Sequence, residues 1–302
     1  MKKGFSLIEI LILSFIGISI LILIIGVMSN SREFARTMGC VNNIKSIAQA
    51  IENYQADFKE TPVTLSSLMP TYIQNSSVFH CPSDRKKLDS YSAYYIGRYF
   101  AEEDSNKAFL ICPRHFGGKR VVVGYLSYAV DIGKTKLVNW SGLNAEFGKT
   151  YSGGNLNFED GTKVNILNGK LGVLGSFTDT EGKIYSIIYV PEGENTSIEV
   201  DHKTDSRFEV ITPAVIAGVE GTKFNVVNTY FIDNGIPIDR TSFAVFEGVI
   251  EVIERNRGRR EQVQANEEIV IETKTYEEIK KGVPRKPPKV KPHMIKKSKN
   301  NS

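Results

Sequence analysis

The 302-residue sequence is poor in the residues on which much protein chemistry depends: it has three cysteines, four histidines and one tryptophan. Three cysteines are too few for a small secreted fold that is held together by many disulfides. The composition, 41% hydrophobic and 24% charged, is ordinary for a globular protein. It excludes a wholly disordered chain, a collagen-like chain and a protein that crosses a membrane many times.

Sequence motifs for common enzyme chemistry are also missing. Gly-Lys-Thr occurs twice, ending at Thr135 and Thr150, but the glycine that opens a phosphate-binding loop is replaced by Tyr128 and Leu143. There is no His-Glu-x-x-His or Gly-x-Ser-x-Gly sequence, and the histidines are scattered. The polar segment around His202 is expected to be a solvated turn. We therefore predict a protein that is not an enzyme, with no catalytic residue, no cofactor and no metal site.

The net charge of +4 comes from the C-terminus. Residues 280–302 contain nine of the 38 basic residues and no acidic residue, which leaves 29 basic against 34 acidic residues in the rest of the chain. Four prolines in this segment favour an extended, disordered tail. The Lys280–Ser302 tail is expected either to keep the protein soluble or to contact an anionic polymer or surface, such as lipid head groups, teichoic-type polymers or nucleic acid.

The strongest signal is an apolar run near the N-terminus. Residues 10–28 are 19 residues without a charge, and as a helix they would span about 28 Å, close to the hydrocarbon core of a bilayer. Lys2 and Lys3 precede the run and place the N-terminus in the cytoplasm. A cleaved secretory signal peptide would have a shorter apolar region and a small-residue cleavage site. An uncleaved signal anchor fits the run but does not explain Glu9, since a carboxylate at the edge of a membrane span is costly.

The residues before the run, Gly4-Phe5-Ser6-Leu7-Ile8-Glu9, resemble the processing site of type IV pilins and type II secretion pseudopilins. The resemblance implies that a prepilin peptidase cleaves after Gly4 and that the new terminus, Phe5, is methylated. Glu9 becomes the fifth mature residue, where the family carries a glutamate. In lipid, this carboxylate can be neutralised by the terminal amine of a neighbouring subunit. Other pilin-like subunits, in a homo- or hetero-filament, are therefore implied as partners.

An amphipathic helix is predicted over residues 29–60, continuous with the membrane span. Its apolar residues recur at intervals of three and four: Phe34, Met38, Val41, Ile44, Ala48, Ile51, Tyr54 and Phe58. Short β-prone runs between glycines follow at 121–138 and predict a small sheet. With residues 1–4 as the leader, we expect residues 5–140 to form a pilin-like domain whose small α/β head covers 61–140.

Two Cys-Pro sequences lie in this head, at Cys81 and Cys112, and the second is followed by His115. Cys-Pro turns with a following histidine occur in some pseudopilin heads. Outside the cytoplasm paired cysteines favour a disulfide, so we predict Cys81–Cys112. A Cys40–Cys81 disulfide is the alternative, and the sequence does not decide between the two pairings. A zinc site of His80, Cys81, Cys112 and His115 is less favoured, because adjacent His80 and Cys81 point awkwardly for tetrahedral ligation.

Residues 141–279 read as an all-β domain, because short β-prone runs alternate with Asp-Gly and Asn-Gly turns. The segments 156–162, 208–224 and 244–252 resemble the FecR-type domain, known from the extracytoplasmic part of sigma-factor regulators. The arginine of that family before its Gly-Thr-x-Phe unit is replaced by Glu220. Gly221 and Gly248 are expected at turns or bulges.

Together these features predict an α+β protein: a long N-terminal transmembrane-plus-amphipathic helix, a small α/β head and an all-β sandwich or solenoid. We expect a single-pass protein of the cytoplasmic (inner) membrane, with its C-terminal domains outside the cytoplasm. The predicted function is a minor or accessory subunit of a type IV pilus or type II secretion pseudopilus. The alternative is a single-span envelope sensor whose FecR-type domain receives a signal.

Overall fold

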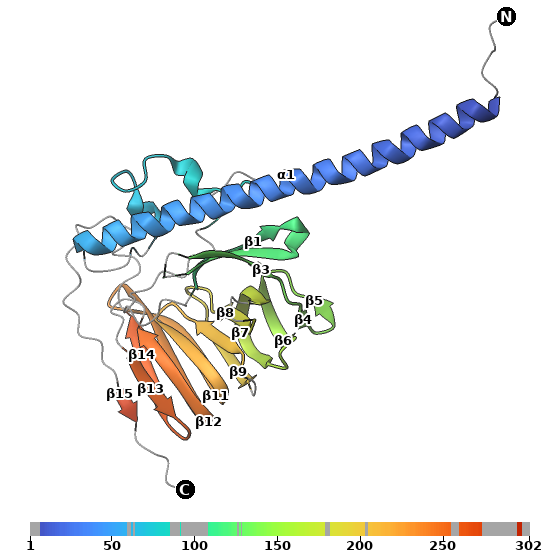
Figure 1. Cartoon of the computed structure of the whole chain (residues 1–302). Helices are drawn as coiled ribbons and strands as arrows, with labels where there is room; N and C mark the ends of the chain where they lie inside the picture. The colour runs from blue at the N-terminus through green and yellow to red at the C-terminus, as the bar shows by residue number, and fades with distance from the viewer. Residues whose placement is uncertain are drawn as a thin grey trace, which may run out of the picture.

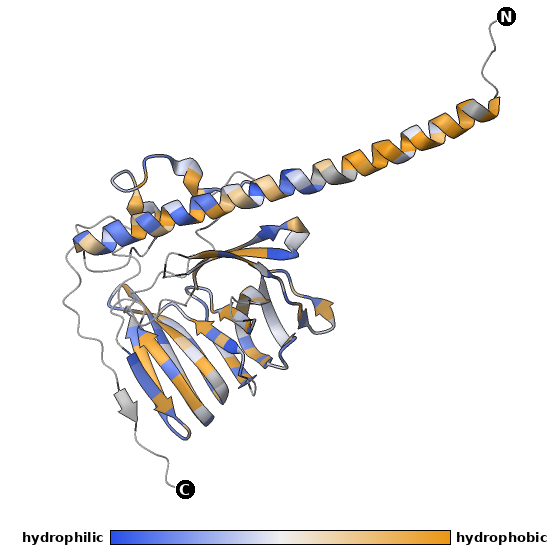
Figure 2. Ribbon diagram, viewed as in Figure 1, coloured by the Kyte–Doolittle hydropathy of each residue, from blue (hydrophilic) through white to orange (hydrophobic). Residues whose placement is uncertain are grey.

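The computed structural model describes residues 7–58, 62, 64–84, 91, 108–125, 127, 129–178, 182–202, 205–254, 260–273 and 295–297. One continuous helix of 52 residues, α1 (Leu7–Phe58), opens the fold. Its first half projects away from the rest of the protein, and its second half lies across the head (Figure 1). The projecting half is the apolar one (Figure 2). The predicted single helix, running from the apolar segment into the head, is therefore confirmed.

The head is built from short helical turns and a three-stranded antiparallel sheet. The turns are η1 (Leu65–Leu68), η2 (Ser76–Phe79) and η5 (Phe116–Gly118). The strands, in the order β1-β2-β3, are β1 (Ala108–His115), β2 (Arg120–Tyr125) and β3 (Val130–Lys134). Side chains alternate between the two faces of a strand, so β1 and β2 can each contribute to two cores.

The first of these cores lies between the sheet and α1. Leu110, Cys112 and Val122 point to α1 and are buried with Ile44 and Ile47 of the helix. Val121, Val123 and Ile111 point the other way and pack with residues of the second sheet, including Phe177. The head sheet is thus the middle layer between α1 and the β domain.

The helical stripe that packs on the head differs in part from the predicted one. Phe34 and Met38 are 57% and 39% exposed, whereas Thr37 and Cys40 are fully buried. Thr37 is the first buried residue of α1 among the side chains that the structure describes. The head thus buries α1 side chains from this turn onward, and the described apolar side chains before Thr37 are exposed.

The second sheet has twelve strands, β4 to β15. In chain order they are β4 (Val138–Trp140), β5 (Leu143–Asn144), β6 (Thr150–Phe158), β7 (Lys163–Thr178), β8 (Ile184–Tyr189), β9 (Thr196–His202), β10 (Arg207–Ile211), β11 (Val215–Asp233), β12 (Ile236–Glu254), β13 (Arg260–Gln264), β14 (Glu268–Thr273) and β15 (Ile295–Lys297). Strand pairing closes on itself through β7, β8, β10, β11 and β9. Apart from β8 with β10, the strand pairs in the described part of the chain are antiparallel.

The two longest strands, β11 and β12, form a hairpin across this domain. Asn234 and Gly235 turn the chain with positive φ angles of 51° and 79°, as a tight two-residue hairpin requires. The pairing shifts register between Glu220 and Lys223, and Gly221 and Gly248 both have positive φ there. The expectation that these two glycines occupy a bulge is confirmed.

The overall α+β architecture, with a long helix followed by a large all-β domain, is as predicted. One local prediction is wrong: His202 does not lie in a solvated turn but is fully buried at the end of β9. Its Nε2 lies 3.0 Å from the Ser206 carbonyl and its Nδ1 2.7 Å from Thr162 Oγ1. These two contacts give both ring nitrogens a hydrogen-bond partner inside the β domain. The ring also stacks on Phe208.

Candidate functional site

The projecting half of α1 is the first candidate site. It is long and apolar enough to cross a membrane, and its most apolar 18-residue window has none of its side chains buried within the chain. Phe15 and Leu23, for example, are 74% and 69% exposed. A core helix of a soluble protein would bury these side chains, whereas here they are exposed, as in a helix that lies in lipid or against another protein.

The residues of the predicted processing motif are only partly within the described structure. Gly4 and Phe5 lie outside the described residues. Glu9 lies in the second turn of α1, and its side chain is outside the described part. Cleavage after Gly4 and docking through Glu9 therefore stay predictions.

The second candidate site is a group of three cysteines and one histidine, which we call the Cys/His cluster: Cys40, Cys81, Cys112 and His115. Cys40 comes from α1, Cys81 from the segment after η2, and Cys112 and His115 from β1. One ligand atom from each residue lies within 4.8 Å of the other three. All four side chains are buried, with Cys81 the most exposed at 2%.

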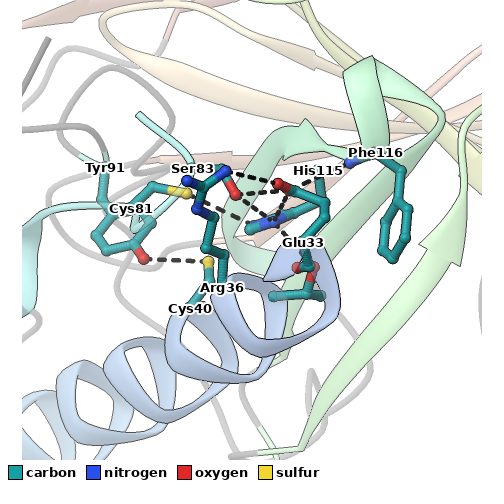
Figure 3. A network of polar contacts seen from close by, with 9 residues as sticks. Glu33, Arg36, Cys40, Cys81, Ser83, Tyr91, His115 and Phe116 are labelled. Atoms are coloured by element: carbon teal, nitrogen blue, oxygen red, sulfur yellow. Dashed lines mark hydrogen bonds and ion pairs between the residues drawn. The ribbon is translucent and has the colours of Figure 1, made fainter. Parts of the chain in front are cut away.

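The close approach of α1 to the first Cys-Pro turn depends on Gly39. A Cβ atom at this position would lie 3.1 Å from Pro82 Cγ, so a larger residue would push the helix and the turn apart. This glycine lets the neighbouring Cys40 reach the two cysteines of the head. In Figure 3, Cys81 and His115 lie beside the stretch of α1 that carries Glu33, Arg36 and Cys40.

The hydrogen bonds around His115 determine which ring nitrogen carries the proton. Nδ1 lies 3.2 Å from Thr37 Oγ1 and 3.1 Å from Ser83 Oγ. The Thr37 hydroxyl donates to the Glu33 carbonyl, and the Ser83 hydroxyl donates to Glu33 Oε1 at 2.7 Å. Because both hydroxyls donate elsewhere, they can only accept from His115, which places the proton on Nδ1. Nε2, on the other side of the ring, lies 3.6 Å from Cys81 Sγ.

Glu33 joins the polar groups around His115 by hydrogen bonds and ion pairs. Burial alone would raise the pKa of its carboxyl, but hydrogen bonds from Ser83 and from the Phe116 N–H outweigh burial and leave the pKa below its ordinary value. Arg36 lies 3.4 Å away on the same helix, and His115 Nδ1 lies 3.5 Å from Glu33 Oε1. An ionised carboxylate therefore stands behind the histidine, on the side away from the sulfurs.

The sulfurs are in strongly unequal environments. Hydrogen bonds from Cys112 and Cys40 lower the pKa of Cys81, whereas burial raises the pKa of the other two thiols. The buried Tyr91 hydroxyl donates to Cys40 Sγ at 3.0 Å. Burial likewise raises the pKa of Tyr91, so the phenol remains a hydrogen-bond donor. Negative charge is thus favoured on Cys81, whereas Cys40 and Cys112 favour the neutral thiol.

This arrangement differs from both predictions made for the cysteines. Cys81 and Cys112 do come together, but both are free thiols in the structure rather than the predicted disulfide, and so is Cys40. The four-residue group contains Cys40 where the sequence suggested His80. The sequence offered Cys40 as an alternative disulfide partner of Cys81 and did not place it beside His115.

Comparison with known proteins adds limited information. The sequence model of a family described as a protein of unknown function (DUF1559) matches residues 29–71. This stretch covers the second half of α1 and the first turns of the head. Together with the apolar helix before it, the match fits a pilin-like protein. No curated protein matches the sequence.

Similarity to solved structures is weak. Two crystal structures of a protein from Parabacteroides distasonis ATCC 8503, described provisionally as an anti-sigma factor, align with this chain at 18% and 16% identity. They cover 52% and 54% of this chain and 58% and 61% of their own, with TM-scores of 0.33 and 0.32. TM-scores in this range do not establish a shared fold. The FecR-type resemblance of the β domain stays a prediction.

Proposed function

We propose that the chain is a non-enzymatic pilin-like subunit, which is cleaved after Gly4, anchored in the cytoplasmic membrane by residues 10–28 and assembled with other pilin-like subunits through α1. The observation that carries this proposal is the form of α1. A single helix is bare and apolar over its first half and packed on the head over its second half. A simple membrane anchor does not need to be continuous with the core helix of the domain that it anchors.

The bare half of α1 has two suitable environments in such a subunit. Before assembly, lipid covers its apolar side chains, which removes them from water. After assembly, the same side chains pack against the helices of neighbouring subunits. A rigid helix that runs without a break into the head places the head at a fixed position relative to this packing surface.

Glu9 supplies the polar part of the proposed contact. A carboxylate near the lipid core is unfavourable when isolated and is stabilised by a positive charge. After cleavage, the positive charge available at this depth is the terminal amine of Phe5 on the next subunit. This pairing would select the correct axial position of one helix relative to the next.

The position of the β domain fits an accessory subunit. It packs on the face of the head sheet opposite α1, so the head sheet separates the β domain from the helix (Figure 1). Some residues of the second half of α1, such as Lys45 and Gln49, stay exposed. A twelve-stranded appendage on every subunit would be bulky for a main filament component, so we propose a minor or accessory role.

The test is cross-linking in cells of the source organism, followed by identification of the partners. We expect the wild-type chain to cross-link with other pilin-like subunits, and the identity of these partners to distinguish a type IV pilus from a type II secretion pseudopilus. Gly4→Leu should remain full length, and Glu9→Val should be processed and membrane-bound but lose the cross-links. Lys45→Gln, an exposed substitution outside the apolar run, serves as the control and should behave like the wild type.

Two results would contradict the proposal. One is a Gly4→Leu chain that is the same length as the wild type, which would show that no cleavage occurs at this site. The other is a processed chain that never cross-links to a pilin-like subunit. The second result would favour the single-span envelope sensor, in which α1 serves only for insertion.

A further inference from the structure

We propose that the Cys/His cluster is a structural Zn²⁺ site that fastens α1 to the head. The four residues come from three segments that are far apart in the sequence, and they converge with their ligand atoms inward. Three thiolates and one imidazole form a common ligand set for structural zinc. The inference is independent of the proposed assembly function, because it concerns how the head is held together.

The spacing of the ligand atoms matches tetrahedral zinc. With a Zn–S bond of about 2.3 Å and a Zn–N bond of about 2.0–2.1 Å, the sulfur-to-nitrogen edge of the tetrahedron is about 3.6 Å. The distance from Cys81 Sγ to His115 Nε2 is 3.6 Å. The upper bound of 4.8 Å over all the pairs leaves small inward shifts of the remaining side chains to complete the site.

The hydrogen bonds that orient the His115 ring suit a zinc ligand. Nδ1 carries the proton and donates it to the hydroxyls of Thr37 and Ser83, backed by Glu33. Nε2 then faces the sulfurs, 3.6 Å from Cys81 Sγ. Zinc-binding histidines commonly donate their second ring nitrogen to a carboxylate or another acceptor, which fixes the tautomer and the ring orientation. The chain His115–Ser83–Glu33 provides such an arrangement.

A disulfide explains less of this geometry. A bond between two of the sulfurs would leave the third sulfur and His115 Nε2 facing each other without a common function. Tyr91 would still donate to Cys40. A disulfide would not require the contacts with Ser83 and Glu33 that orient the His115 ring. A zinc ion uses all four inward-facing atoms, and the Tyr91 hydroxyl then donates to a zinc-bound thiolate.

The site is closed, which indicates a structural rather than a catalytic metal. Catalytic zinc keeps one position open for water, whereas four protein ligands fill the coordination sphere. All four side chains are buried, so no substrate can reach the ion. When Zn²⁺ binds, the three thiols release their protons to solvent, and the site keeps one net negative charge near the Tyr91 hydroxyl.

The position of the cluster gives the metal a mechanical role. Cys40 lies one turn after Thr37, where α1 first becomes buried. Zinc at this point would join the helix to β1 and to the Cys-Pro turn at the place where a pull on the membrane-anchored half would first separate them. It would also hold the direction in which the helix leaves the head.

The proposal is tested on the full chain, purified in detergent without chelators. We expect elemental analysis to find about one zinc per chain and thiol titration in denaturant with chelator to find three free thiols. Replacement of zinc by Co²⁺ should give the visible absorption of a tetrahedral cobalt–thiolate site. Less than one tenth of a zinc per chain after incubation with Zn²⁺, or a disulfide-linked peptide pair among the three cysteines, would overturn the proposal.

Variants separate the ligands from their neighbours. Cys40→Ser and His115→Ala should retain at least tenfold less zinc, whereas His80→Gln should retain as much as the wild type. Since a ligand variant can fail to fold, His115→Cys provides a conservative replacement that should keep zinc and change the cobalt spectrum towards four thiolates. Equal zinc in His80→Gln and Cys40→Ser would contradict the assignment of Cys40 as a ligand.

Discussion

Ile44 of α1 lies directly against Gly124 of β2. A Cβ atom on Gly124 would come within 2.6 Å of Ile44 Cγ2 and 2.7 Å of Phe109 Cε1, which is closer than carbon atoms approach. The absence of a side chain at Gly124 therefore allows the helix to lie flat on the head sheet. This contact sets the distance between α1 and the head sheet.

Gly124→Ala should consequently destabilise the head by about 1–3 kcal/mol, because extra volume in a packed core forces side chains or backbone to shift. The free energy of unfolding, from urea titration of the full chain in detergent, measures this effect. Adding Ile44→Ala should cost less in the Gly124→Ala chain than in the wild type, since it relieves part of the clash. Lys45→Ala, on the exposed face of α1, is the control. Additive effects would show that the two residues are not in contact.

Phe177 joins the head to the β domain. It is fully buried, lies 3.4 Å from the Cβ position of Gly133 in β3 and faces the Tyr185 ring in its own domain. Phe177→Ala should cost about 3–5 kcal/mol and loosen the two parts from each other. Limited proteolysis should then cut faster between Lys134 and Val138, where one sheet ends and the other begins. Leu167→Ala, on the same strand but 55% exposed, should leave the cleavage rate unchanged.

His202 should stabilise the β domain rather than act on a ligand. His202→Ala removes the partner of the Ser206 carbonyl and the Thr162 hydroxyl in a buried place, which costs about 1–3 kcal/mol for each polar group left unpaired. Thermal unfolding of the full chain should show a lower transition temperature for this variant. Val227→Ala, 41% exposed on the adjacent β11, should have a much smaller effect. An unchanged transition temperature for His202→Ala would contradict this structural role.

The fold class could be predicted because it depends on sequence patterns within single helices and hairpins. An uncharged run of 19 residues and apolar residues at intervals of three and four are properties of one helix, and turn residues between β-branched runs are properties of hairpins. Phe34 and Met38 obeyed the same periodicity yet are exposed, because the pattern does not show where the head begins to cover the helix.

The Cys/His cluster depended on packing that the sequence does not show. The sequence connected Cys81 with Cys112 through their shared Cys-Pro pattern, but Cys40 joins them through the packing of α1 on the head, where Gly39 lies close to Pro82. The burial of His202 has the same origin: its polar neighbours in the chain suggested solvent, whereas Phe208 of β10 and Thr162, in the turn before β7, cover it. Contacts between distant segments decided both cases.

The basic tail gives a prediction that is separate from the fold. Most of residues 280–302 lie outside the described residues, although Ile295–Lys297 pair with β14. If the tail contacts anionic polymers, deleting residues 280–302 should make the chain elute from immobilised DNA at lower salt, because nine positive charges are lost. A variant with glutamine in place of the nine basic residues keeps the length and should elute equally early. Unchanged elution of both would leave the tail as a solubilising terminus.

The central claim, that this is a processed pilin-like subunit, is tested most directly by mass spectrometry of the N-terminal peptide from the mature protein. The account predicts a peptide that begins at Phe5 and carries a methyl group on its terminal amine. A peptide that begins at Met1 would contradict it.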